Sequence, residues 1–386
     1  MKQFDIIVVG GGMVGAAVAL GLARQGKRIA MVERRAPEAF SSDQPMDLRV
    51  SAISPASVSL LQSLKVWNDV LAMRVCPYRR LETWEHPECR IRFSADSMDL
   101  QQLGFIVENR ILQLALWHAC EAQENLDIFC PGNIVAMRPE NHGHSVELDD
   151  GSILYGHWLV GADGANSRVR DYANIGVTAW DYRQHCMLVN VKTELPQQDI
   201  TWQWFTPEGP RSFLPLPGHQ GSLVWYDSPA RINALCAMSP TALRDEILTH
   251  FPRELGDIEV LQQGAFPLTR RHAQRYYNQQ IVLLGDAAHT INPLAGQGVN
   301  LGFKDVDALL DVVADAGVEW ANNGVLAAYE RKRKPDNLIM QTGMDVFYGG
   351  FSNDIAPLKL LRNVGLKLAE NSGLVKRQVL KYAMGL

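Results

Sequence analysis

Three glycines near the start of the chain have the spacing of a nucleotide-binding turn. Gly10, Gly12 and Gly15 form a G-x-G-x-x-G pattern after the run FDIIVV, and Glu33 follows 18 residues after the last glycine. Such glycines permit a tight turn and let the backbone approach a pyrophosphate at the start of a helix, while the acid can accept hydrogen bonds from a ribose. The alternative is a purely structural turn. Because Glu33 would repel a 2′-phosphate, the pattern favours FAD or NAD over NADP.

Two later motifs decide between these nucleotides. Residues 161–170 read GADGANSRVR and residues 285–300 read GDAAHTINPLAGQGVN, each after an apolar run. Asp286 could accept hydrogen bonds from ribityl hydroxyls. The N–H groups of residues 296–299 would open at the start of a helix, where the helix dipole favours the negative charge of a reduced flavin. NAD has no use for this second anion site, so the motifs favour FAD.

The order of elements around these motifs predicts the fold. Residues 4–9 and 27–33 are typical of buried parallel strands, residues 13–24 and 112–124 of helices, and residues 158–161 of a further strand. Residues 174–266 change to β-rich segments cut by Gly and Pro, as in an antiparallel sheet, and the chain then returns to a strand and helices. We therefore expect one discontinuous nucleotide-binding domain that a β-rich domain interrupts.

We predict an α/β chain with three parts. A Rossmann-like FAD-binding domain comprises residues 1–75, 105–173 and 275–345; an interleaved antiparallel β-sheet substrate domain comprises residues 76–104 and 174–274; and residues 346–386 form C-terminal helices. Aromatic residues between 201 and 226 form either the core under the sheet or the wall of an apolar substrate cavity. Arg271 belongs either to a solvated basic turn or to that cavity. The substrate candidates are Trp204, Phe213, Trp225, Tyr226 and Arg271.

Composition excludes several other classes of protein. The 386 residues carry 37 basic and 42 acidic side chains, a net charge of −5, and 47% are hydrophobic, as in ordinary globular proteins. The acidic balance argues against nucleic acid as a partner. Six scattered cysteines lack metal-ligand spacing, so we expect no metal and reduced thiols. Without a secretory pattern or an apolar run long enough to span a bilayer, we expect a cytoplasmic location.

In this order, the three motifs resemble those of the class A FAD-dependent aromatic monooxygenases, the para-hydroxybenzoate hydroxylase-like group. Within it, the runs DLRVSAIS, GFIVEN and PLAGQGVNLG resemble the ubiquinone-biosynthesis hydroxylases. The runs PYRRLETWE, SLVWYDSPARI and AFPLTRRHA resemble those family members that act on a polyprenylated methoxy-methyl-benzoquinol. The resemblance implies the para-hydroxybenzoate hydroxylase fold. It also implies ring hydroxylation of that quinol through a flavin C4a-hydroperoxide, with NAD(P)H as transient reductant and O₂ as co-substrate.

The resemblance also implies roles for particular residues. Gly10, Gly12 and Gly15 would hold the pyrophosphate of noncovalent FAD, Glu33 the adenosine ribose and Asp286 the ribityl chain. Arg49 and Asn109 would reach the phosphate and ribose region, and Asp163 with Gly164 would also help to bind the nicotinamide donor. The residues around the isoalloxazine would be Pro293, Gly296, Gln297, Gly298, Val299 and Asn300, with Pro293 and Gln297 as candidates beside the reacting ring. His289 is interpreted as a hydrogen-bonding residue at a helix entry, and the sequence identifies no catalytic acid or base.

Alternatives remain for the reaction and for the partners. The chain could be a hydroxylase of an earlier ubiquinone precursor, another FAD-dependent reductase, or a flavin-binding subunit of a biosynthetic complex without turnover. Since a polyprenyl quinol resides in the bilayer, we expect delivery at a membrane surface or by a partner complex. The basic C-terminal residues either contact anionic lipid or an acidic partner, or form the solvated face of a helix packed on the FAD domain; they are Lys359, Arg362, Lys367, Lys376, Arg377 and Lys381.

Overall fold

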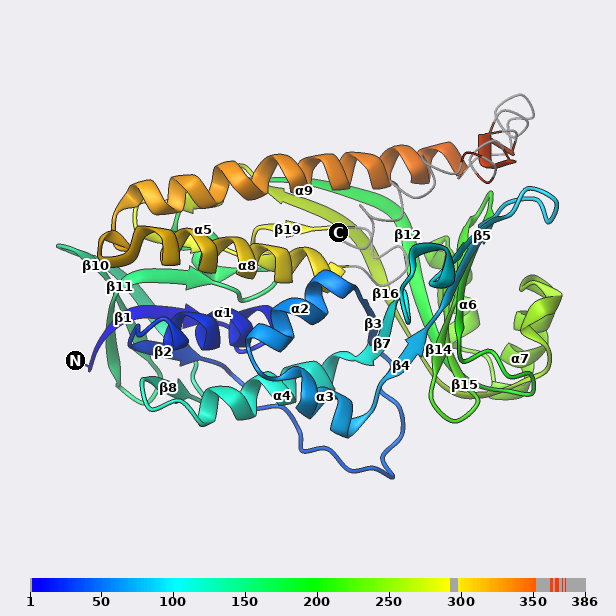
Figure 1. Cartoon of the computed structure of the whole chain (residues 1–386), viewed down its shortest axis with the longest axis horizontal. Coiled ribbons are helices and arrows are strands. Elements are labelled where there is room, and N and C mark those ends of the chain that lie inside the picture. The colour runs from blue at the N-terminus through cyan, green and yellow to red at the C-terminus, as the bar shows by residue number, and fades with distance from the viewer. Residues whose placement is uncertain are drawn as a thin grey trace.

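The described residues form two eight-stranded sheets and one three-stranded sheet. The computed structural model describes residues 2–291, 298–351, 362, 363, 365–367, 370 and 372. In Figure 1 the first large sheet and its helices lie at the left, and the second large sheet lies at the right. The long helix α9 (Asn323–Phe351) runs along the top of both. The predicted α/β class is confirmed.

The first sheet has a central parallel core. Its strand order is β17-β18-β11-β1-β2-β8, with a hairpin of β9 and β10 paired to β11. The bounds are β1 (Lys2–Val9), β2 (Ile29–Val32), β8 (Leu126–Phe129), β9 (Ile134–Glu140), β10 (Gly143–Leu148), β11 (Ile153–Gly161), β17 (Tyr277–Asn278) and β18 (Ile281–Leu283). Strands β18, β11, β1, β2 and β8 pair in parallel. Because helices cover both faces of such a sheet, these strands read as apolar runs, which is why the sequence predicted them.

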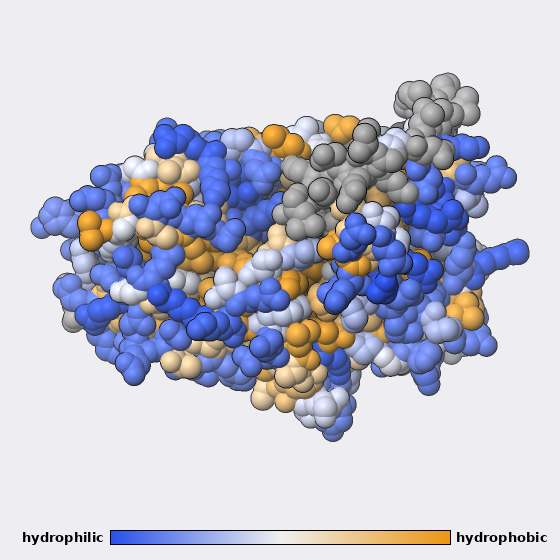
Figure 2. Space-filling view, in the orientation of Figure 1, coloured by the Kyte–Doolittle hydropathy of each residue, from blue (hydrophilic) through white to orange (hydrophobic). Residues whose placement is uncertain are grey.

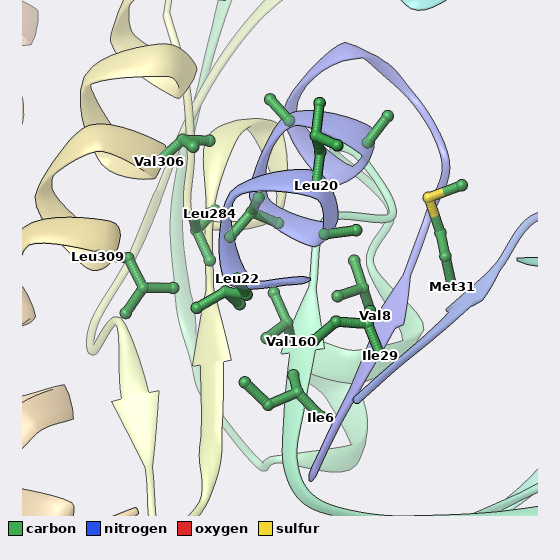
Figure 3. Close-up of a cluster of buried hydrophobic side chains, with 14 of the residues drawn as sticks. Ile6, Val8, Leu20, Leu22, Ile29, Met31, Val160, Leu284, Val306 and Leu309 are labelled. Atoms are coloured by element: carbon green, nitrogen blue, oxygen red, sulfur yellow. The ribbon is translucent and has the colours of Figure 1, made fainter. Parts of the chain in front are cut away.

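Helices pack on this sheet through apolar side chains. In Figure 3, Ile6 and Val8 of β1 lie against Leu20 and Leu22 of α1, with Val306 of α8 beside them. The helices of this part are α1 (Met13–Arg24), α2 (Pro55–Ser63), α3 (Trp67–Met73), α4 (Asn109–Glu121), α5 (Arg168–Tyr172) and α8 (Gly298–Ala316). The predicted bounds of α1 are correct, whereas α4 begins three residues earlier than predicted and ends at Glu121.

The second sheet has the order β19-β16-β12-β15-β14-β13-β5-β6. Its pairs are antiparallel except for β13 with β5, which run parallel. The bounds are β5 (Arg80–Trp84), β6 (Ile91–Ser94), β12 (Val177–Thr193), β13 (Ile200–Thr206), β14 (Gly209–Leu216), β15 (Gln220–Asp227), β16 (Ile258–Ala273) and β19 (His289–Thr290). Helices α6 (Pro229–Cys236) and α7 (Pro240–His250) pack on one face of it. Each begins with a serine cap followed by proline, a strong start signal.

A small antiparallel sheet of β3 (Val50–Ile53), β7 (Gly104–Glu108) and β4 (Cys76–Tyr78) joins segments from both predicted domains. Strand β19 likewise brings the third motif into the second sheet by pairing with β16. The predicted domain boundaries therefore cut through shared sheets, and the division itself stays a prediction. Short 3₁₀ turns also occur at Asp96–Met98, Arg253–Leu255, Gly285–Ala287 and Gly317–Glu319.

The surface in Figure 2 is mostly hydrophilic, with smaller apolar areas between. Among the described residues, no helix combines the length and the hydropathy that a membrane span requires. The same part of the chain contains no cluster of three or more His, Cys, Asp or Glu side chains that could hold a metal ion. All six cysteines are free thiols, and three of them are buried.

Candidate active site

The three motifs meet at one edge of the first sheet. Each follows a parallel strand, and these strands, β1, β11 and β18, are direct neighbours. Backbone hydrogen bonds continue the pairing into the loops, because Ala162 donates to Val9 (2.9 Å) and Leu284 donates to Gly161 (3.0 Å). The carboxyl ends of parallel strands are where such sheets bind ligands. The sequence prediction that residues far apart in the chain form one site is consistent with this placement.

The three glycines of the first motif have different surroundings: two lie against backbone atoms and one faces open space. A Cβ atom at Gly10, whose φ is +103°, would lie 2.4 Å from the Ala162 carbonyl oxygen, and one at Gly15 would lie 1.8 Å from that of Gly10. A Cβ at Gly12 would meet no described atom within 4 Å. Gly12 is also the N-cap of α1, where backbone N–H groups and the helix dipole favour an anion. The open space at Gly12 therefore fits a phosphate.

Glu33 lies beside this turn, immediately after β2. Its Oε2 accepts a hydrogen bond from the Gly11 N–H (2.6 Å) and its Oε1 accepts one from the Arg34 N–H (2.7 Å). The carboxylate thus has a structural role in the turn that the sequence analysis did not foresee. A ribose contact by Glu33 stays a prediction.

The second motif is a capped loop that reaches the third. Asp163 accepts a hydrogen bond from the Arg168 N–H (2.7 Å), which caps the start of α5, and Gly164 has a φ of +80°. The buried Arg170 donates to the carbonyl of Ala287 in the third motif (3.0 Å). Because the Asp163 carboxylate already accepts a hydrogen bond from the backbone of its own loop, its observed role is to hold the shape of that loop. The contact of this loop with a cofactor or donor stays a prediction.

Arg49 and Asp286 lie next to strands of different sheets: Arg49 directly precedes β3, and Asp286 lies in the turn after β18. Asp286 is exposed, but the protein around it partly withdraws its carboxylate from water and raises its pKa, against the opposing effect of the positive charges of His289 and Arg49. The exposed Arg49 guanidinium lies over the Phe266 ring, 5.0 Å from its centroid. Asn109, at the start of α4, donates its N–H to the Arg49 carbonyl (3.1 Å). The structure therefore joins Asn109 to Arg49 and places the Arg49 charge within electrostatic reach of Asp286; their contacts with a cofactor stay predictions.

Helix α8 begins at Gly298, followed by Val299 and Asn300. The Asn300 side chain is buried and donates to the Ala52 carbonyl (2.7 Å), while its Oδ1 accepts from the Ser54 N–H (3.0 Å) and the Ser57 hydroxyl (2.7 Å). This side chain ties α8 to β3 and α2, and a flavin contact at this position stays a prediction. Three further predicted flavin contacts lie outside the described residues; they are Pro293, Gly296 and Gln297.

Three of the five substrate candidates point to the covered face of the second sheet. Phe213 and Trp225 are buried in the cluster that packs against α6 and α7, and Phe213 stacks on Trp202 with ring centroids 5.6 Å apart. Trp204 packs on the same cluster, and its indole N–H donates to the Glu85 carbonyl (3.1 Å). The packing of these three residues matches the alternative interpretation as core, and a substrate contact by any of them stays a prediction.

The other two candidates lie elsewhere. Tyr226 points to the opposite face of the sheet, in a buried cluster with Leu214, Val224 and residues of the three-stranded sheet. Arg271 donates to the Ala165 carbonyl (2.7 Å) and to the Asn166 side chain (2.6 Å), so it joins the second motif. The sequence analysis missed Asp305, a buried acid of α8 that contacts His289. An acid between apolar residues on the inner face of an amphipathic helix was the available signal.

Comparison with known proteins gives matches along nearly the whole chain. Residues 3–339 match a family model described as FAD binding domain. The chain is 53% identical over 385 residues to 3-demethoxyubiquinol 3-hydroxylase of Escherichia coli (strain K12), covering 99% of this chain and 98% of the relative. It is 33% identical to ubiquinone hydroxylase UbiL of Rhodospirillum rubrum, covering 100% of this chain and 90% of the relative.

Solved structures share the fold at low identity. The crystal structure of p-nitrophenol 4-monooxygenase from Pseudomonas putida matches with a TM-score of 0.82 at 18% identity, over 100% of this chain and 98% of that chain. A ternary complex of aklavinone-11 hydroxylase with FAD and aklavinone matches with a TM-score of 0.70 at 21% identity, over 88% of this chain and 68% of that chain. At these identities the likeness shows the fold.

Proposed function

Because the chain belongs to the FAD binding domain family and to the ubiquinone-biosynthesis hydroxylases within it, we propose that it is an FAD-dependent monooxygenase of ubiquinone biosynthesis. Its proposed substrate is the ring of a polyprenylated methoxy-methyl-benzoquinol, in keeping with the name of the relative that is 53% identical. The observation that carries the proposal is the meeting of three nucleotide-type loops at the carboxyl ends of β1, β11 and β18.

The residues at this edge fit FAD. The open space at Gly12 and the uncapped start of α1 suit the pyrophosphate, and Asp286 is exposed toward solvent where ribityl hydroxyls could reach it. Bound FAD supplies the redox chemistry, taking electrons from NAD(P)H and activating O₂. The chain holds the cofactor, keeps water from the reacting ring and orients the quinol, whose electron-rich ring needs no strong base. Arg271 and Tyr226 remain proposed residues of the substrate side.

A single reaction tests the proposal. Apoprotein reconstituted with FAD is given NADH or NADPH, labelled O₂ and a demethoxy-quinol with a short prenyl tail, and the product is identified by mass. We expect one labelled oxygen atom in the ring. If only an earlier ubiquinone precursor is hydroxylated, that precursor is the substrate. NAD(P)H oxidation without any hydroxylated quinol would favour a reductase. No NAD(P)H oxidation at all would favour a flavin-binding subunit without turnover.

We further infer that a protein with this substrate works at a membrane surface or in a complex, with a cytoplasmic location. Within the predicted basic face, the Arg362 side chain is only 8% exposed and pairs with Glu85, which follows β5 of the second sheet. Lys367 is exposed. Lys359, Lys376, Arg377 and Lys381 lie outside the described residues.

Exposed apolar side chains offer a second means of contact with lipid. Trp180 of β12 is 68% exposed, and Ile339 and Val346 of α9 are 64% and 69% exposed. Amphipathic aromatic and aliphatic side chains of this kind favour a bilayer interface. We expect Trp180→Ser and Ile339→Ser to reduce co-sedimentation with vesicles that contain anionic lipid. The control is Val318→Ser, which removes an even more exposed apolar side chain (93%) from a 3₁₀ turn. Equal losses in all three variants would contradict a specific surface.

A further inference from the structure

A buried carboxylate stands directly behind the third motif. Asp305 lies two turns into α8 and is fully buried. Taking an ionised carboxylate out of water is costly unless donors surround it. Four donors do so here: the Gly285 N–H (3.0 Å), the His289 Nε2, the Arg333 Nε (2.8 Å) and the Asn337 amide (3.1 Å). Burial alone would raise the pKa of Asp305, but its contacts with His289 and Arg333 hold that pKa below its usual range.

Helix α9 fixes this carboxylate from one side. The Arg333 guanidinium also pairs with Asp336 and donates to the Asn337 side chain. Asn337 in turn donates to the Tyr276 hydroxyl (3.2 Å), next to the first sheet. Arg333 and Asn337 are buried as well. Asp305 is therefore held in one orientation by residues that the cofactor motifs do not contain.

The other side of the carboxylate holds the turn that carries Asp286. One oxygen, Oδ2 of Asp305, accepts from both Gly285 and His289, which flank Asp286 in the chain. Helix α8 approaches this turn closely, since a Cβ at Gly302 would lie 3.5 Å from the Gly285 Cα. Gly285 itself has a φ of +57°. A single buried atom thus ties down the turn on both sides of the exposed acid.

We propose that Asp305 is a positioning residue for FAD, which rests on the proposed function. Its carboxylate fixes the Gly285–His289 turn so that Asp286 is presented to the ribityl chain. Its negative charge also balances that of Arg333 beneath the turn. Loss of the charge while the side-chain shape is kept should therefore change both the affinity for FAD and the electronic state of the bound flavin.

The test compares Asp305→Asn with Asp311→Asn. Both acids lie on α8 and pair with a cation of α9, but Asp311 and its partner Lys332 are about half exposed and away from the motif. We expect Asp305→Asn to weaken FAD binding to apoprotein about ten-fold or more, because the turn that presents Asp286 to the ribityl chain is no longer held in one orientation. The reduction potential of the FAD that remains bound should become more positive, because a negative charge that disfavours the reduced flavin is gone. Asp311→Asn should change neither quantity.

Each outcome has a clear meaning. A folded Asp305→Asn protein with unchanged FAD affinity and potential, or with lower thermal stability alone, would overturn the proposal, as would equal effects in Asp311→Asn. If Asp305→Asn does not fold, His289→Gln keeps a donor toward Asp305 but removes the imidazole, and an unchanged flavin potential in that variant would overturn the proposal too. Wild-type protein that binds no FAD would instead contradict the proposed function.

Discussion

Substitutions in the glycine turn can distinguish residues that the fold requires from residues that leave space for a ligand. Since a Cβ at Gly12 meets no described atom within 4 Å, Gly12→Ala should cost less than about 1 kcal/mol of stability, as a change of an N-cap glycine. The added methyl group would occupy the space assigned to the pyrophosphate, so FAD affinity should fall about ten-fold or more. Thermal unfolding of apoprotein and titration with FAD measure the two effects.

Gly15→Ala is the matched comparison, because there the new Cβ would lie 1.8 Å from the Gly10 carbonyl oxygen. This variant should lose stability by about 1–3 kcal/mol or more before any cofactor is added. If both variants lost stability equally, the space around Gly12 would not be open. If Gly12→Ala bound FAD as tightly as the wild type, the pyrophosphate would not lie at Gly12.

Glu33 serves both purposes, and two substitutions separate them. Glu33→Ala removes the acceptor for the Gly11 and Arg34 N–H groups and the predicted ribose contact together, so both apoprotein stability and FAD affinity should fall. Glu33→Gln keeps one acceptor oxygen and should lose less stability. FAD affinity should fall about ten- to hundred-fold in the Ala variant. A dissociation constant that stays at the wild-type value in both variants would place Glu33 outside the cofactor site.

At the scale of elements, the sequence predicted correctly those strands, turns and helices that neighbouring residues determine. The run FDIIVV, the glycine turn and the small residues of α1 specify strand, turn and helix within 24 residues, and all three are where the sequence placed them. Phe213 and Tyr226 show the limit. Strand alternation separates the two faces of the second sheet, but which face the helices cover depends on where α6 and α7 pack, which no local pattern contains.

Asn300 and Asp305 show the same limit within a motif. The motif indicated proximity to a cofactor, but the Asn300 side chain bonds to groups almost 250 residues earlier in the chain. Asp305 depends on Arg333 and Asn337, whose place beside it follows from the packing of α9 on α8. Long-range partners of buried polar groups therefore had to come from the structure.

An ion pair between elements positions the segment that carries Arg49. Arg74, after α3, forms a two-pronged pair with the nearly fully buried Glu108 and donates to the Gln44 carbonyl, while Glu108 accepts from the Asp47 N–H. Arg74→Met would leave Glu108 as an unpaired buried charge, so stability should fall by about 3–5 kcal/mol. Urea unfolding measures this loss, and FAD titration should show weaker binding because Arg49 is no longer held.

Arg35→Met is the control for that change, since the Arg35–Glu38 pair is exposed on both sides. Exposed pairs contribute about 0–1 kcal/mol, so little loss is expected. Comparable destabilisation by the two variants would mean that the Arg74–Glu108 pair adds nothing beyond ordinary surface charge.

At the scale of the whole molecule, two buried histidines should make folding sensitive to mild acid. Burial lowers the pKa of His144, helped by His157, and burial with the neighbouring charge of His289 lowers that of His272 to about 4. A histidine with a folded pKa below its unfolded value of about 6.5 is neutral in the folded state at pH values where the unfolded chain binds a proton. Its contribution to stability is complete above about pH 6.5 and is lost as the pH falls toward 4.

His272→Gln should therefore flatten the dependence of stability on pH between about 6.5 and 4, by up to about 1.4 kcal/mol for each pH unit, which is the effect of one proton. Urea unfolding at several pH values in this window gives the slope for wild type and variant. His118→Gln is the control, because its side chain is exposed on α4. A wild-type slope in His272→Gln would show that His272 is protonated in the folded protein. The acid sensitivity would then have to come from other groups, of which His144, whose pKa burial also lowers, is the first to test.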